Sequence, residues 1–119
     1  MVARPYSGLI RRGDILLIEF GPARSAEADV VRPAVVITNN AANAGADAIT
    51  VIPLTANLNS LYGFQLLLPT ERTGLNQDTK AQTELIGSIA LSRVRRRLGH
   101  VPEDLMRELD ARIRLHLAL

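Results

Sequence analysis

The sequence predicts a mainly β fold with one C-terminal helix, built as a small antiparallel barrel or half-barrel in a single domain, residues 1–119. Short apolar segments separated by Gly, Pro and Asn fill the first hundred positions. Leu105, Leu109, Ile113 and Leu117 then recur at helical spacing. A length of 119 residues suits one domain, and several strands followed by one helix favour this architecture.

The strands are expected where apolar runs stop at turn residues. Residues 1–11 form a loose arm, and residues 21–32 form a polar loop. Segment 94–97 fits either a short strand or a helical turn. The expected strands are 14–20, 33–39, 47–54, 64–68 closed by Pro69, and 81–90 with a bulge or bend at Gly87.

The C-terminal helix has clear boundary signals. Pro102 suits the first helical position, and Glu103 and Asp104 suit the first turn. Three acid-first pairs four residues apart should support it, namely Glu103–Arg107, Glu108–Arg112 and Asp110–Arg114. The apolar stripe of this helix is expected to pack on the barrel.

The composition excludes several classes of function. Without cysteine there are no disulfides, thiolate catalysis or cysteine metal sites, which fits a cytoplasmic protein. The apolar runs are too short to span a membrane, and residues 1–12 lack the apolar segment of a signal peptide. We also expect no metal and no cofactor, since the chain carries neither a glycine-rich phosphate loop nor a cluster of ligands.

The basic residues are thirteen arginines and a single lysine, Lys80, with a formal net charge of +2. Arginine binds phosphate with a planar fork of donors, although a genome's preference for arginine codons explains the bias equally well. A cluster at Arg93, Arg95, Arg96 and Arg97 could follow a phosphate backbone or simply face solvent.

Arg32 and Thr55 are predicted to lie together. If segments 33–39 and 48–54 form a symmetric hairpin, residues whose numbers add up to 87 face each other, and Arg32 and Thr55 meet this condition. Their Cβ atoms would lie about 5 Å apart. Pro33 and Pro53 stiffen the two strand ends. The pair is a plausible phosphate site, but a rim arginine and a turn-capping threonine explain the geometry as well.

The order and spacing of several motifs resemble the MazF/PemK toxin endoribonucleases over residues 12–119. The matching segments are Arg12-Gly-Asp14, Pro22-Ala-Arg24 followed by Glu27, Arg32-Pro-Ala-Val-Val36, Asn39, Val51-Ile-Pro-Leu-Thr55 and Phe64. The resemblance implies an SH3-like barrel of the CcdB/PemK type with appended helices, and a homodimer. It implies metal-independent cleavage of single-stranded mRNA at a short sequence, giving 2′,3′-cyclic phosphate and 5′-hydroxyl ends. The implied inhibitor is an antitoxin with a disordered acidic C-terminal tail.

The resemblance also assigns residues. The family's catalytic arginine and threonine fall on Arg32 and Thr55, and its loop glutamate falls on Glu27. Arg24, Glu27, Asn39 and Asn57 are the expected RNA-binding residues. The chain departs from the family pattern at Leu85 and Gly87, where many members have Gln and Arg. This protein is therefore expected to read a different base or to read it more loosely.

Cyclic-phosphate chemistry needs a base, an acid and a group that stabilises charge on phosphorus. Arg32 suits the last two roles, because a guanidinium holds its proton too firmly to serve as a base. Thr55 would donate to a phosphate oxygen. The base stays open; Glu27 is a candidate, although it could instead contact a base edge. His100 and His116 fit structural roles better.

Two other functions fit the same fold. A gyrase-poisoning toxin of the CcdB type would engage its target with an aromatic C-terminal tip, whereas this chain ends His116-Leu-Ala-Leu119 and has no Trp. An inactive RNA- or peptide-binding module is the other alternative. Incubation with a long RNA in EDTA separates the three.

Overall fold

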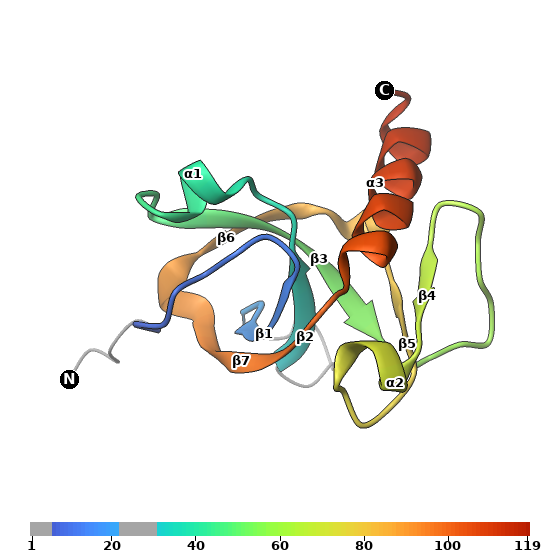
Figure 1. Ribbon diagram of the computed structural model, residues 1–119, viewed down its shortest axis with the longest axis horizontal. Helices are drawn as coiled ribbons and strands as arrows, with labels where there is room; N and C mark the ends of the chain where they lie inside the picture. Colours follow the sequence, from blue (N-terminus) through green and yellow to red (C-terminus); the bar gives the residue numbers. More distant parts are fainter. Residues whose placement is uncertain (1–5, 22–30) are drawn as a thin grey trace.

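An antiparallel sheet with a helix beside one end forms this computed structural model, which describes residues 6–21 and 31–119 (Figure 1). The elements are β1 (Asp14–Glu19), β2 (Val31–Val36), α1 (Asn40–Asn43), β3 (Ala48–Thr55), β4 (Leu66–Leu68), α2 (Thr70–Thr73), β5 (Thr79–Ala81), η1 (Thr83–Leu85), β6 (Gly87–Ala90), η2 (Leu91–Arg93), β7 (Val94–His100) and α3 (Glu103–Leu117). The prediction of a mainly β fold with a C-terminal helix is confirmed.

Six of the seven strands follow the order β4-β5-β3-β2-β1-β7, and the seventh, β6, pairs with β3 beside β5. The sheet curls strongly in Figure 1, but the pairings among the described strands do not close it into a complete barrel. β3 is the centre of the arrangement, because it pairs with β2 along one edge and with β6 and then β5 along the other.

The register predicted for the β2–β3 hairpin is confirmed. Ala34 faces Pro53, Val35 faces Ile52 and Val36 faces Val51, and each pair of numbers adds up to 87. β1 covers the other edge of β2, with Ile18 opposite Arg32. Arg32 and Thr55 therefore lie at the same end of this hairpin.

The prediction of one continuous strand over 81–90 is wrong. β5 pairs Ala81 with Leu54, and β6 pairs Gly87 with Val51. Between these two pairings the chain advances six residues, from 81 to 87, whereas the paired positions on β3 differ by only three, from 54 to 51. The extra residues cannot pair with β3, and they leave the sheet as the 3-10 turn η1. A pairing mismatch of this kind depends on a distant strand, so the local pattern of 81–90 does not reveal it.

Other boundaries differ in smaller ways. The loop at 40–46 contains the short helix α1, whose first turn Asn39 caps by accepting from the Ala42 amide at 2.9 Å. Segment 94–97 is a strand, since β7 runs through it to His100. Pro102 is the N-cap of α3 rather than its first residue. The N-terminal arm predicted at residues 1–11 is not loose throughout, because Ile10 is buried in the core.

Helix α3 is held by packing and by bonds to other elements. Leu105, Met106 and Leu109 are buried, whereas Leu117, the last residue of the predicted stripe, is exposed. The acids of α3 also pair away from the helix: Asp110 with Arg12, and Asp104 with Arg72 at 2.7 Å. Within the described residues, none of the three predicted pairs along the helix forms an ion pair.

The apolar residues form two cores. The first lies between the sheet and α3 and is centred on Ile15, Ile52 and Leu109. The second lies on the other face of the sheet, under Tyr6 and Ile10. Among the described helices, none is long and apolar enough to cross a membrane.

Candidate active site

A hollow of about 570 Å³ lies at the end of the β2–β3 hairpin, between the loop that follows α2 and the strand β7. Its apolar wall includes Leu17, Leu54 and Leu98. Its polar lining is Arg32, Thr55, Asn76, Gln77, Thr79 and Arg96. The structure thus brings Arg32 and Thr55 to one cavity, as the hairpin arithmetic predicts.

Arg32 is half-buried and held from one side. Its Nη1 donates to Oε1 of Gln82 at 3.3 Å. Gln82 is itself fixed, because its backbone N–H donates to the carbonyl of Pro53 at 2.9 Å. A guanidinium carries five donors, so this contact orients Arg32 while, among the described residues, its other donors have no acceptor.

Thr55 presents a hydroxyl whose proton has no acceptor among the residues that the structure describes. Its Oγ1 accepts from the amide of Asn57 at 3.2 Å, and Asn57 Oδ1 accepts from the amide of Asn59 at 3.1 Å. These two bonds order the start of the loop after β3. Because Oγ1 acts as the acceptor here, the hydroxyl remains able to donate to an oxygen in the cavity.

Three further contacts hold the loop that follows Thr55. The ammonium of Lys80, which is buried, donates to the carbonyl of Ser60. Arg112 of α3 donates to the carbonyl of Gly63 at 2.7 Å. Phe64 is half-buried; its ring stacks on Tyr62 and lies tilted against the ring of His116.

Thr79 adds a hydroxyl that lacks a protein partner. The residue is only 4% exposed, and its Oγ1 has no hydrogen-bond partner among the described residues. Buried hydroxyls are nearly always satisfied, so an unpartnered hydroxyl in the wall of a cavity is unusual. Thr79 faces the same hollow as Arg32 and Thr55.

Arg96 supplies a second cation to the cavity, and the other arginines of its cluster are engaged elsewhere. Arg95 pairs with Glu19, Arg97 pairs with Asp14 at 3.3 Å, and Arg93 donates to the Glu19 carbonyl at 3.4 Å. The cluster is therefore divided: one member lines the hollow and three are tied to β1.

The far wall of the hollow depends on a close approach of two backbones. A Cβ on Gly99 of β7 would lie 2.3 Å from the carbonyl oxygen of Thr73, so only glycine lets α2 sit against this strand. Gly74 then ends α2 in the left-handed conformation, with φ of 83°. This path carries Asn76 and Gln77 to the cavity.

The predicted RNA-binding residues are distributed unevenly. Arg24 and Glu27 lie outside the described residues. Asn57 is exposed and lies two positions after Thr55, beside the hollow. Asn39 caps α1 and is not part of the cavity wall.

Sequence reasoning did not identify the contributions of Thr79, Gln82, Asn76 and Gln77. Gln82 reaches Arg32 across 50 positions of sequence, and the burial of Thr79 follows from tertiary packing alone. For Asn76 and Gln77 the one local signal is the run Gly74-Leu-Asn76, which is typical of a loop but does not show that the loop lines the cavity. Within residues 6–21 and 31–119, no group of three or more His, Cys, Asp or Glu side chains has the geometry of a metal site.

Comparisons with known proteins agree with this architecture. Residues 11–117 match the family of PemK-like, MazF-like toxins of type II toxin–antitoxin systems. A relative from Mycobacterium tuberculosis (strain ATCC 25618 / H37Rv), Endoribonuclease MazF9, is 45% identical over 116 residues, covering 93% of this chain and 98% of the relative.

Solved structures share the fold at lower identity. MazF from Deinococcus radiodurans superposes with a TM-score of 0.78 at 22% identity, covering 95% of this chain and all of that one. An endoribonuclease in complex with its cognate antitoxin, from a mycobacterial species, gives 0.73 at 16% identity over 93% of this chain and 95% of that one. The family match over nearly the whole chain and the 45% identity to its relative lead to one conclusion: this chain belongs to the PemK/MazF-like toxins of type II toxin–antitoxin systems.

Proposed function

We propose that this chain is a toxin endoribonuclease that cuts single-stranded mRNA at a short sequence without a metal ion. The observation that carries the proposal is the hollow that Arg32, Thr55, Thr79 and Arg96 line together. A close relative is named an endoribonuclease, which supports the same reaction class.

The reaction is an internal transesterification. The 2′-oxygen attacks phosphorus, its proton passes to a base, and the bond from phosphorus to the 5′-oxygen breaks. A 2′,3′-cyclic phosphate and a 5′-hydroxyl result. Arg32 stabilises the negative charge that develops on phosphorus, since a guanidinium is cationic and rich in donors. It also passes a proton to the leaving 5′-oxygen, and solvent returns a proton to the guanidine.

Other groups in the hollow hold the substrate. Thr55 donates to a phosphate oxygen, and Arg96 adds a second cation for the same or a neighbouring phosphate. Asn76 and Gln77 offer two side-chain amides, which suit hydrogen bonds to a base edge. The base that takes the 2′ proton is not among these groups, and Glu27 remains its candidate, outside the described residues.

The proposal includes the partners of the family. The chain acts as a homodimer in the cytoplasm, and an antitoxin with a disordered acidic C-terminal tail blocks the basic hollow. The complex of a related mycobacterial endoribonuclease with its cognate antitoxin supports the antitoxin partner.

The test is incubation of the purified chain with a long RNA in EDTA, followed by primer extension to map the cuts. We expect discrete fragments with cyclic phosphate ends. Arg32→Ala should reduce cleavage below detection while the protein stays folded, and Arg107→Ala, which removes an exposed arginine of α3, should cut normally. Wild-type cleavage by a folded Arg32→Ala protein would exclude this assignment.

A further inference from the structure

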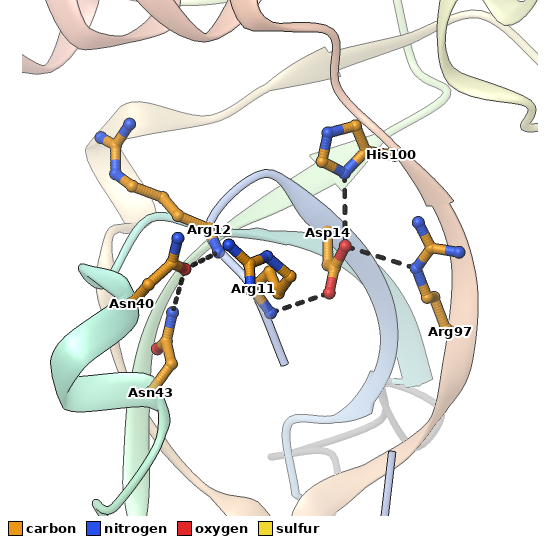
Figure 2. Close-up of polar contacts among 7 residues, drawn as sticks. All are labelled: Arg11, Arg12, Asp14, Asn40, Asn43, Arg97 and His100. Atoms are coloured by element: carbon orange, nitrogen blue, oxygen red, sulfur yellow. Dashed lines mark hydrogen bonds and ion pairs between the residues drawn. The ribbon is translucent and has the colours of Figure 1, made fainter. Parts of the chain in front are cut away.

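Two charged side chains are buried among the described residues, and they are held in different ways. The carboxylate of Asp14 lies 3.3 Å from Nε of Arg97 and accepts from the backbone N–H of Arg11 at 2.9 Å (Figure 2). Lys80 is 5% exposed, and across residues 6–21 and 31–119 it forms no ion pair. Its ammonium donates to a neutral group, the carbonyl of Ser60. Burial of a charge without a counter-charge costs free energy, so stability alone does not account for a lysine at this position.

Lys80 lies beside Thr55 on the sheet. In the antiparallel pairing of β3 with β5, Thr55 faces Lys80, so the two side chains project from the same face with Cβ atoms about 5 Å apart. Their neighbours Leu54 and Ala81 project from the opposite face, into the core between the sheet and α3. Lys80 therefore points away from this core. Its ammonium lies instead against the loop that follows β3, to which it is bonded at Ser60.

The first half of this loop belongs to a closed cycle of contacts that begins and ends at Thr55. Oγ1 of Thr55 accepts from the backbone N–H of Asn57 at 3.2 Å, and Oδ1 of Asn57 accepts from the backbone N–H of Asn59 at 3.1 Å. The next residue, Ser60, accepts from Lys80, and Lys80 pairs with Thr55 in the sheet. The bond from Lys80 is thus the step of the cycle that returns from the loop to the sheet.

This cycle determines how Thr55 presents its hydroxyl. While the N–H of Asn57 donates to Oγ1, that oxygen acts as an acceptor, and its own proton is directed away from the loop. Thr55 lines the candidate active site together with Arg32, so a phosphate held there lies within the region open to that proton. Without the bond to Ser60, the loop is free to leave the sheet, and Oγ1 then loses the contact that fixes its orientation.

We propose that Lys80 is a positioning residue for the candidate active site: it holds the loop after β3 against the sheet, so that the Thr55 hydroxyl keeps one orientation toward the phosphate. This assignment rests on the proposed function. Lys80 does not contact the substrate, because its ammonium is buried and bonded to the loop. Removal of the ammonium therefore acts on the rate through Thr55 and has little effect on the affinity for RNA.

The experiment is single-turnover cleavage of a fixed RNA in EDTA by Lys80→Met, which removes the ammonium and keeps an unbranched stem. We expect the rate constant to fall about tenfold, the effect of losing one hydrogen bond from a charged group. The enzyme concentration at half-saturation should stay close to the wild-type value. Lys80→Arg, which keeps a cation and a donor, should recover most of the rate. A wild-type rate constant for Lys80→Met would overturn the proposal.

The melting temperature separates positioning from a purely structural role. Lys80→Met should melt at the wild-type temperature or above it, since an apolar side chain at this position no longer buries a charge. A lowered melting temperature together with a loss of rate that Lys80→Arg does not restore would identify a structural residue and overturn the assignment.

A double-mutant cycle tests whether Lys80 acts through Thr55. Thr55→Val removes the hydroxyl and keeps the shape of the side chain. In this background we expect Lys80→Met to change the residual rate by no more than about twofold, because no hydroxyl is left to orient. The same loss in both backgrounds would show a general disturbance of the site and would exclude the positioning role.

A further readout does not depend on cleavage. Solvent exchange of backbone amides, followed by NMR, should be faster at Asn57 and Asn59 in Lys80→Met, because the bonds of these amides depend on the closed loop. Arg112→Met is the matched control: it removes a cation that donates to Gly63 at the far end of the same loop, and it should leave exchange at Asn57 unchanged. Equal acceleration in the two variants, or none in Lys80→Met, would overturn the proposal.

The proposed function and the role of Lys80 can fail separately. If long RNA stays intact with the wild-type chain while exchange at Asn57 accelerates in Lys80→Met alone, the proposed function fails and the ordering of Thr55 by Lys80 stands. If the wild-type chain and Lys80→Met cut RNA at the same rate, the proposed function stands and the positioning role fails.

Discussion

Gln82 is predicted to set the catalytic power of Arg32 without touching the substrate. Its Oε1 accepts from Arg32 at 3.3 Å, and its backbone is fixed to Pro53 at 2.9 Å, which ties the arginine to the strand that carries Thr55. A hydrogen bond to a charged group contributes about 1.5–3 kcal/mol. The bond is long and only part-buried, so the lower end applies, and about 1.5 kcal/mol corresponds to roughly a tenfold change in rate.

The perturbation is Gln82→Leu, which keeps the approximate size of the side chain and removes the acceptor. We expect kcat on a fixed RNA to fall about tenfold with little change in KM, because the arginine loses its orientation toward phosphorus rather than its charge. Gln82→Glu should restore most of the rate, since a carboxylate keeps an acceptor at the same reach. Single-turnover cleavage and the melting temperature are the measurements. Wild-type kcat in a folded Gln82→Leu protein would refute the positioning role.

Two further predictions concern the fold. Leu109→Ala should lower the free energy of unfolding by about 2–5 kcal/mol, because the side chain is fully buried between α3 and the sheet; urea denaturation measures this, and a loss below 1 kcal/mol would contradict the packing described. The hydrogen bond from Arg72 lowers the pKa of Asp104 below its usual 3.8, so the pair stabilises the fold above that value and the contribution disappears as the pH falls through the lowered pKa. Arg72→Ala should raise the pKa of the Asp104 carboxyl, as followed by NMR titration, and an unchanged pKa would show that the pair is absent in solution.

The sequence predicted well where local pattern and neighbouring strands decide the structure. The β2–β3 register followed from a short connection and symmetric pairing, and it brought Arg32 and Thr55 to one cavity. Helix α3 followed from its leucine spacing and its acidic first turn. These features depend on residues close together in the chain.

The sequence-based predictions failed where a residue far away in the chain determines the local structure or the contact. The turn η1 exists because two strands pair with β3 at mismatched positions. The acids of α3 pair with arginines at positions 12 and 72 rather than with those one turn away, because the helix packs against those segments. Gln82 and Thr79 joined the candidate site through the same long-range packing, and neither the period of the sequence nor its motifs encodes that contact.

Lys80 gives the protein an internal reporter of loop opening. It is the only lysine in the chain, it is buried, and its ammonium is bonded to Ser60 in the loop that begins beside Thr55. An amine-reactive reagent therefore reaches Lys80 only after that loop has released it. The rate of acylation at this position, read by mass spectrometry against the N-terminal amine, counts the openings of the loop in the native state and shows whether bound RNA slows them.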